Sequence, residues 1–231
     1  PDRRIFPLDM PPLAEHLARR LDFAITLARE CGALARREAA QLQVSSKGAH
    51  DVLTQADLAV ERLVRQRVAE SFAGDLVVGE EMGGQAQVGN AGNFWLVDPI
   101  DGTANYATDV PRWCISIAYL EAGRPVLGVL YDPMMDRLYS AGLNTGAWLN
   151  DRPIRARDSS HLKGATVELG WSTRRTPSDY LAKAAALLEA GCAFTRRGSG
   201  ALGLADVAAG RVDGYAELHI NAWDCAAGIL L

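Results

Sequence analysis

The spacing of apolar residues predicts two amphipathic helices near the start of the chain. Residues 12–40 place leucine, alanine and cysteine side chains three and four positions apart, which is the period of a helix with one apolar face. The polar stretch that follows, QLQVSSKGAHD, predicts a loop or short hairpin with Lys47 near its centre. Thr54 then caps a second helix that runs to about Ser71. Asp57 stands in its first turn, where the helix dipole favours a carboxylate.

Shorter apolar runs in the rest of the chain predict strands first and then strands alternating with helices. Strands are expected at Leu76–Gly79, at Phe94–Val97, as an antiparallel group between Trp113 and Tyr139, at Ala165–Leu169 and near Tyr215. Helices are expected at Ser178–Leu188, at Ala201–Ala208 and from about Trp223 onward. This order favours a layered α/β or α+β fold over a simple parallel Rossmann sheet.

Composition narrows the class of protein. With 231 residues, of which 48% are hydrophobic, the chain can bury one sizeable core, and residues 1–231 are interpreted as a single domain. The net charge is −4 and the sequence has no basic tract, so a nucleic-acid partner is not favoured. No apolar run reaches the roughly twenty residues that span a membrane, and PDRRIFPLDMPP lacks the apolar core of a signal peptide. A cytoplasmic protein is therefore expected.

The cysteines and the C-terminal sequence carry two further expectations. Cys31, Cys114, Cys192 and Cys225 are far apart and form no CxxC pair. They are interpreted as free thiols rather than as a zinc site or a disulfide framework. The sequence stops inside WDCAAGILL, an apolar run that predicts a helix without its C-cap, so more chain is expected after Leu231.

The segment WLVDPIDGTANY, residues 95–106, carries the most informative chemistry. A buried strand ends at Asp98, and Asp101 follows three residues later, so that two carboxylates can point into one pocket. Gly102 lets the backbone come close to a ligand, and the amides of residues 102–104 open a turn that can bind phosphate oxygens. Carboxylates beside such amides need a cation between them, and oxygen ligands favour magnesium. A turn in which both carboxylates only cap backbone groups is the alternative for this segment alone.

Three more acidic residues occur where predicted elements begin or end. Glu80 ends a strand in VVGEEMGG, Asp57 opens a helix, and Asp224 opens another helix after Trp223. Binding and catalytic sites are usually assembled at such positions. Several acids beside a Gly-Thr anion-binding turn therefore indicate a metal site.

The chain resembles the inositol monophosphatase family, within the wider lithium-sensitive, magnesium-dependent phosphatases. The resemblance rests on four segments in order: DVLTQAD at 51–57, GEE at 79–81, WLVDPIDGT at 95–103 and WDCAAG at 223–228. It covers nearly the whole chain and implies an αβαβα sugar-phosphatase-like sandwich with alternating helix and sheet layers. It also implies one catalytic domain, a homodimer, inhibition by lithium, and a small-molecule phosphate monoester as substrate.

The resemblance implies two magnesium ions and a third, weaker ion near Glu80. Glu80, Asp98 and the backbone carbonyl of Ile100 would hold the first ion. Asp98, Asp101 and Asp224 would hold the second, with Asp98 bridging the two.

The resemblance also implies the catalytic residues. Asp57 would accept a hydrogen bond from the hydroxyl of Thr103, and Thr103 with Glu80 would orient and deprotonate the attacking water. The amides of Gly102 and Thr103 would hold the phosphate, and Lys47 matches a lysine on a mobile, metal-sensitive loop. Attack by water would be in-line on phosphorus, because the acids are spaced DxxD and lack the DxDx(T/V) pattern of an aspartyl nucleophile.

The substrate side of the resemblance points to an inositol phosphate. Glu217 matches the family carboxylate that hydrogen-bonds inositol hydroxyls, and an exposed acid at a strand end is the alternative. RRGSGALGLADVAAG matches a loop whose backbone lines the substrate site. The residues implied to contact the substrate are Lys47, Asp101, Gly102, Thr103, Gly198, Ser199, Gly200, Glu217 and Asp224.

Three functions remain open from the sequence. The first is hydrolysis of inositol monophosphate. The second is a sister phosphatase acting on histidinol phosphate, fructose bisphosphate, NADP or a bisphosphate nucleotide. The third is a protein that keeps the fold but binds RNA polymerase or other transcription and ribosome-maturation machinery, as a bacterial relative does. The complete set of acids argues against a binding-only protein, which has no need of aligned metal ligands, but leaves room for a second role.

Overall fold

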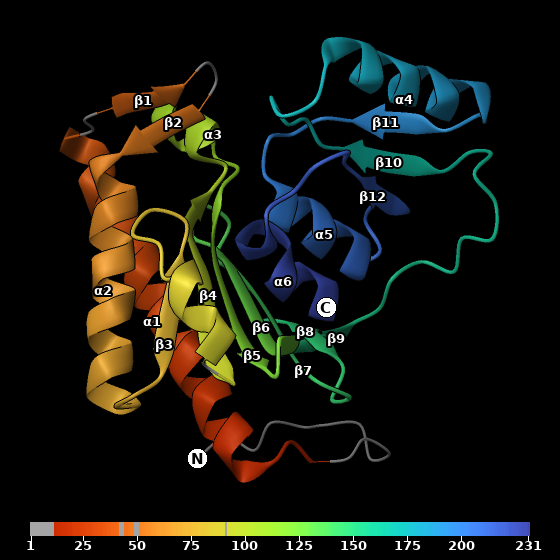
Figure 1. The fold of residues 1–231 in the computed structure, drawn as a ribbon. Helices are drawn as coiled ribbons and strands as arrows, with labels where there is room; N and C mark the ends of the chain where they lie inside the picture. Colours follow the sequence, from red (N-terminus) through yellow and green to blue (C-terminus); the bar gives the residue numbers. More distant parts are fainter. Residues whose placement is uncertain (1–11, 42–43, 49–50, 91) are drawn as a thin grey trace.

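Helices and sheets alternate in five layers. The computed structural model describes residues 12–41, 44–48, 51–90 and 92–231. Across Figure 1 the layers are two long helices, a large sheet, two short helices, a small sheet and one outer helix. This order confirms the αβαβα sandwich that the resemblance implied.

The first layer consists of α1 (Glu15–Glu38) and α2 (Gln55–Ser71), as predicted. A short 3-10 turn (Ala39–Gln41) ends α1, and the antiparallel hairpin of β1 (Val44–Gly48) and β2 (Asp51–Thr54) leads into α2. Both helices bury one apolar face, and in α1 the buried stripe includes Leu17, Leu21, Ala24 and Leu27.

The large sheet has seven strands in the order β3-β4-β5-β6-β7-β8-β9. The pair β3-β4 is parallel and every other pair is antiparallel. The strands are β3 (Leu76–Gly79), β4 (Asn93–Asp101), β5 (Cys114–Glu121), β6 (Arg124–Asp132), β7 (Arg137–Gly142), β8 (Ala147–Leu149) and β9 (Arg152–Ile154). Strand β4 is longer than predicted, and the three-residue strands β8 and β9 were not predicted, because so short a segment shows no alternation.

The remaining layers hold the second half of the chain. Their elements are β10 (Thr166–Leu169), α4 (Pro177–Glu189), β11 (Ala193–Thr195), α5 (Gly200–Ala208), β12 (Gly214–Ala216) and α6 (Ala222–Leu230). The small sheet is parallel with the order β11-β10-β12. A 3-10 helix (Gln85–Asn90) precedes β4, and the short helix α3 (Thr103–Ala107) follows it.

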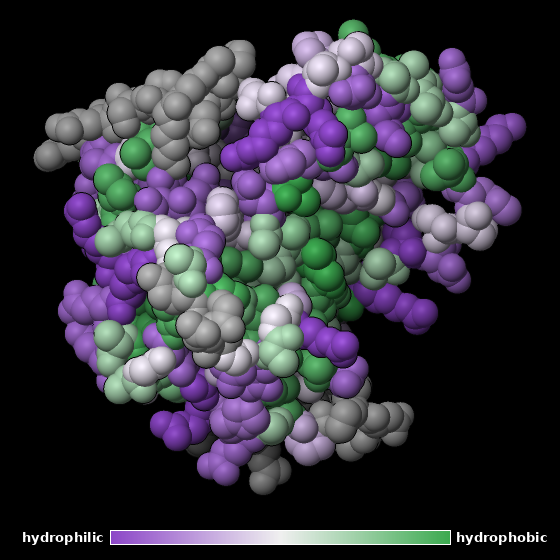
Figure 2. Space-filling model, viewed as in Figure 1, coloured by the Kyte–Doolittle hydropathy of each residue, from purple (hydrophilic) through white to green (hydrophobic). Residues whose placement is uncertain are grey.

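Alternating residues of β4 build the core on both faces of the large sheet. Trp95 and Val97 belong to the cluster under α1 and α2, whereas Phe94 and Leu96 belong to the cluster under α5 and α6. Gly128 of β6 allows α6 to approach closely, because a Cβ there would lie 2.6 Å from a carbonyl oxygen of that helix. In Figure 2 hydrophobic residues gather over α5 and α6, and hydrophilic residues predominate over α2.

Two expectations from composition have an outcome in the fold. The four cysteines are free thiols, as predicted, and three of them are buried. Among the helices that the structure describes, none combines the length and the low polarity needed to cross a lipid bilayer.

Candidate active site

Strand β4 carries two of the predicted carboxylates, and an irregularity in its pairing brings them together. Asp98 pairs with Ser116 of β5 and Asp101 pairs with Cys114, so three steps along β4 oppose two steps along β5. Residues three apart in a regular strand point to opposite faces, and such a bulge removes this alternation. Both carboxylates are buried, and burial raises the pKa of Asp98, which the nearby charge of Asp101 raises further.

Glu80 follows β3 and is fixed by a buried carboxylate that the sequence analysis did not identify. Glu61 of α2 is fully buried and accepts hydrogen bonds from Arg65 at 2.7 and 3.0 Å and from the amide of Glu81 at 2.8 Å. Gly79 lies against this carboxylate, because a Cβ at Gly79 would be 2.2 Å from it. Glu61 therefore holds the backbone on both sides of Glu80.

Asp57 and Asp224 each stand in the first turn of a helix and complete a capping box. Oδ2 of Asp57 accepts the amide of Thr54 at 2.8 Å, and Oδ2 of Asp224 accepts the amide of Asn221 at 3.1 Å. The charges of both aspartates also raise the pKa of Asp98. They therefore combine a structural cap with a place beside the other acids.

Three carboxylates from three separate elements meet in one group. Oxygen atoms of Glu80, Asp98 and Asp224 all lie within 4.8 Å of one another. Burial raises the pKa of Asp98 well above its usual range, and the charges of Glu80, Asp101 and Asp224 raise it further. Like charges this close in a buried site are stabilised by a divalent cation, and oxygen donors suit magnesium. The donor set therefore fits a metal ion.

Asp101 is placed differently from these three. Within the described part of the chain the group that fits a cation contains three carboxylates, and Asp101 is outside it. Its Oδ2 atom accepts hydrogen bonds from the hydroxyl of Ser199 and from the amide of Ala201 at 3.0 Å. Asp101 therefore sits at the N-terminus of α5 and lines the pocket beside the group. Its role as a ligand of a second ion stays a prediction.

The hydrogen bond of Thr103 differs from the one that the resemblance implied. The Thr103 hydroxyl donates to the carbonyl of Ile100 at 2.9 Å, and the hydroxyl of Thr54 donates to Asp57 at 2.6 Å. Thr103 begins α3, so its side chain folds back on the carbonyl three residues earlier. The expected hydrogen bond from Thr103 to Asp57 is therefore wrong. Its acceptor is instead the backbone carbonyl of Ile100, which the resemblance implied as a metal ligand.

A pocket of about 170 Å³ adjoins the three carboxylates. Asp224 belongs to both the pocket and the group of carboxylates. The predicted substrate residues Gly198, Ser199, Gly200 and Glu217 line it. Burial raises the pKa of Glu217, and the hydroxyl of Tyr215 donates to its carboxylate. Lys47 lies in β1, but its side chain is outside the part that the structure describes.

Five pocket residues were not predicted, because they lie outside the segments that carry the resemblance. They are Glu168, Gly170, Trp171, Tyr215 and Ile220. Glu168 had a usable signal, because it is an acid inside an otherwise largely apolar strand and is almost fully buried. Trp171 had none, because its position follows from the pairing of β10 with β12.

A pH dependence of metal binding follows from Asp224. Burial raises its pKa to about 7, with help from the charge of Asp101. A metal ligand must be deprotonated, so binding is present above this pKa and is lost as the pH falls below it. Calorimetric titration with magnesium chloride is expected to give an affinity at least about tenfold lower at pH 6 than at pH 8. Equal affinities at the two pH values would contradict a role for Asp224 as ligand.

Comparison with known proteins assigns the chain to one protein family. The model of the inositol monophosphatase family matches residues 16–231. The chain is 38% identical over 192 residues to a Nus factor SuhB from Xylella fastidiosa, covering 82% of this chain and 69% of that protein. It is 37% identical over 208 residues to an inositol-1-monophosphatase from Rhizobium meliloti, covering 89% and 76%. A solved inositol monophosphatase from Anabaena is similar with a TM-score of 0.82 and 35% identity, covering 94% and 81%.

Proposed function

The chain belongs to the inositol monophosphatase family, and this membership supports a phosphatase activity. We propose that it hydrolyses inositol monophosphate to inositol and phosphate with magnesium. The observation that carries the proposal is the meeting of Glu80, Asp98 and Asp224 within 4.8 Å beside the pocket. These oxygens fit a cation, and the adjoining pocket of about 170 Å³ suits a small substrate. Pockets for drug-sized ligands are larger, at about 300–1,000 Å³.

The proposed metal-binding residues are Glu80, Asp98, Asp224, Asp101 and the carbonyl of Ile100. When bound there, magnesium would acidify a coordinated water and shield the charge that develops on the phosphate. The acids lie just after β3, in β4 and in α6, and they are held by Glu61, by the bulge and by a capping box. The binding geometry is therefore set by the fold before a ligand arrives, which limits the cost of ordering the site.

The remaining site residues are proposed to bind and orient the substrate. The backbone amides of Gly102 and Thr103 begin α3 directly after Asp101, and we assign them to the phosphate. Glu217, held by Tyr215, lies at the pocket wall, where its carboxylate can accept hydrogen bonds from polyol hydroxyls. Glu80 and Thr103 would orient the attacking water and remove its proton. The water oxygen would then bond to phosphorus as the ester P–O bond breaks, and the leaving alkoxide would take up a proton, so that one proton lost by water is balanced by one gained by the alcohol.

Thr103→Ala is expected to lower kcat by about a hundredfold with little change in KM, because the hydroxyl would orient water and the amide would hold phosphate. Steady-state kinetics with inositol 1-phosphate measures both constants. Thr108→Ala is the matched control, because its exposed hydroxyl also donates to a backbone carbonyl, at 2.8 Å, at the far end of α3. A raised KM with unchanged kcat in Thr103→Ala would contradict this assignment.

The proposal is tested by phosphate release from a panel of substrates. The panel contains inositol 1-phosphate, histidinol phosphate, fructose 1,6-bisphosphate, NADP and an adenosine bisphosphate. With magnesium, inositol 1-phosphate is expected to give the highest kcat/KM, and a chelator is expected to abolish release. A higher kcat/KM on another member of the panel would assign the chain to a sister activity. No release from any member would refute the phosphatase proposal.

A second candidate function is binding to transcription machinery. The similarity to proteins named Nus factor SuhB favours it. Such binding needs a surface and not a charged metal site, so Asp98→Asn should leave it intact. Pull-down of purified RNA polymerase by the wild type and by Asp98→Asn tests this. Equal capture by both proteins, above a control protein, would support the role, and no capture by the wild type would refute it.

A further inference from the structure

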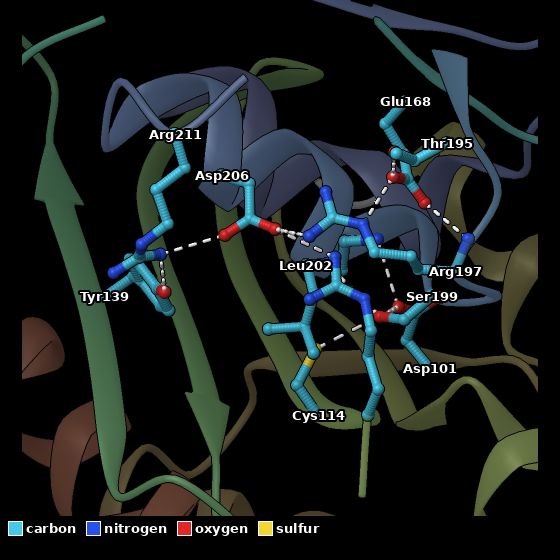
Figure 3. A network of polar contacts seen from close by, with 12 residues as sticks. Asp101, Cys114, Tyr139, Glu168, Thr195, Arg197, Ser199, Leu202, Asp206 and Arg211 are labelled. Carbon is cyan, nitrogen blue, oxygen red and sulfur yellow. Dashed lines mark hydrogen bonds and ion pairs between the residues drawn. The ribbon is translucent and has the colours of Figure 1, made fainter. Parts of the chain in front are cut away.

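Ser199 joins the pocket loop to an acid of the proposed metal-binding centre, as Figure 3 shows. Its side chain is almost completely buried, at 3% exposure of the residue, and it caps α5. Its Oγ atom accepts the amide of Leu202 at 3.2 Å and donates to Oδ2 of Asp101. A serine hydroxyl has one hydrogen, so this donor is committed to Asp101.

The same contact orients the Asp101 carboxylate. Oδ2 accepts the Ser199 hydroxyl, the amide of Ala201 at 3.0 Å and the thiol of Cys114 at 3.9 Å. Oδ1 accepts none of these three hydrogen bonds, so it is the oxygen of Asp101 that can turn toward a cation in the pocket that Asp101 and Asp224 line. Loss of a hydrogen-bond partner that orients a metal ligand typically lowers metal affinity by about 10- to 100-fold.

Ion pairs between Arg197 and two buried carboxylates hold the loop that carries Ser199. Glu168 accepts hydrogen bonds from the amide and from Nε of Arg197, both at 2.7 Å. Asp206 of α5 forms an ion pair with the same guanidinium at 2.9 Å. The side chains of Glu168 and Asp206 are only 3% and 5% exposed, whereas that of Arg197 is 33% exposed, so two buried carboxylates share a partly exposed guanidinium (Figure 3).

Asn105 of α3 holds the loop from the other side. Its Nδ2 atom donates to the carbonyl of Arg197 at 2.8 Å and to that of Arg112 at 2.7 Å. Gly198 has a φ of +83°, and a Cβ there would lie 2.9 Å from the Asn105 side chain. The residue before Ser199 is thus fixed in a left-handed conformation against Asn105.

We propose that Ser199 is a positioning residue for the metal-binding centre: its hydroxyl fixes Oδ2 of Asp101 so that Oδ1 serves the cation, and the Ser199 side chain does not bind substrate. The inference rests on the proposed function, because it assigns Asp101 to the same centre. The resemblance implied that Ser199 contacts the substrate, whereas here its side chain supports Asp101, a proposed metal ligand. Only its backbone remains on the substrate side.

The test is calorimetric titration of the full chain with magnesium chloride alone, together with kinetics at low and saturating magnesium. Ser199→Ala is expected to weaken magnesium binding by between about 10- and 100-fold. Its kcat should return toward the wild-type value at saturating magnesium, and its KM for substrate should stay within about twofold. Ser199→Thr, which keeps the hydroxyl, should restore the affinity to within about threefold.

Thr176→Ala is the matched control, because Thr176 caps α4 through the amide of Asp179 at 3.2 Å and its loss removes a similar cap elsewhere. It should leave magnesium affinity unchanged. If Ser199→Ala does not fold, Ser199→Gly carries the same expectation, because glycine costs less than alanine at this cap. Unchanged magnesium affinity with a raised KM in Ser199→Ala would overturn the proposal. If the wild type is active and only this result fails, the proposed function stands. If the wild type releases no phosphate, the proposed function is refuted, whatever Ser199→Ala does.

Discussion

Asp98→Asn is expected to lower kcat at least about a thousandfold, because it removes the most buried charge of the metal-binding group. Asp98 is 2% exposed, and its oxygens lie within 4.8 Å of those of Glu80 and Asp224. Asparagine has nearly the same shape but no charge, so the loss would report on cation binding and not on packing. Phosphate release from inositol 1-phosphate at saturating magnesium measures it.

Two controls separate this effect from unfolding. Asp132→Asn makes the same change at another buried aspartate, which accepts the amides of Met134 and Met135 and belongs neither to the group of three carboxylates nor to the pocket lining, and it should keep near-normal activity. The pKa of Asp98 is raised in the fold, so its ionisation costs stability as the pH rises above the unfolded value. Without metal at pH 8, Asp98→Asn should therefore melt at or above the wild-type temperature. Near-normal turnover in a folded Asp98→Asn variant would refute the role of Asp98.

Gly79→Ala is expected to lower kcat/KM by about a hundredfold and to destabilise the fold by about 1–3 kcal/mol. The new methyl group would lie 2.2 Å from the carboxylate of Glu61, which is fully buried and held by Arg65. Since Glu61 cannot retreat, the backbone that carries Glu80 must move. A displacement of about 1 Å in a positioned group is enough for such a loss.

Gly92→Ala is the matched control, because a Cβ at Gly92 meets nothing within 4 Å. Its activity and melting temperature should match those of the wild type. Kinetics with inositol 1-phosphate and thermal unfolding in the presence of a chelator measure the two effects separately. Activity within threefold of wild type in Gly79→Ala would show that Glu61 does not control the position of Glu80.

Local patterns predicted the long elements and the acids that lie at their ends. The period of α1 and α2, the cap at Thr54 and the apolar strands β5 to β7 were visible because each is determined by neighbouring residues. The strand that runs to Asp101 was predicted to stop at Asp98, because a proline and a bulge disguise its last residues. Strand β11 was missed, because three residues in a parallel sheet carry no pattern of their own.

The supports of the site could not be predicted in the same way. Glu61 lies 18 residues before Gly79 in the sequence, and their contact depends on how α2 packs on the large sheet. Asp206 binds Arg112, Arg197 and Arg211, and these partners converge only when the two sheets pack against α5. Such contacts depend on how distant elements pack, and therefore no local pattern in the sequence predicts them.

The most direct test is crystallography of the protein with manganese as an anomalously scattering substitute for magnesium. Anomalous peaks are expected at about 2.0–2.6 Å from the oxygens of Asp98, one shared with Glu80 and one with Asp101 and Asp224. Such peaks would establish that acids just after β3, in β4 and in α6 hold divalent cations together. A structure in which manganese binds elsewhere, while crystals of the same protein still hydrolyse inositol 1-phosphate, would contradict the account.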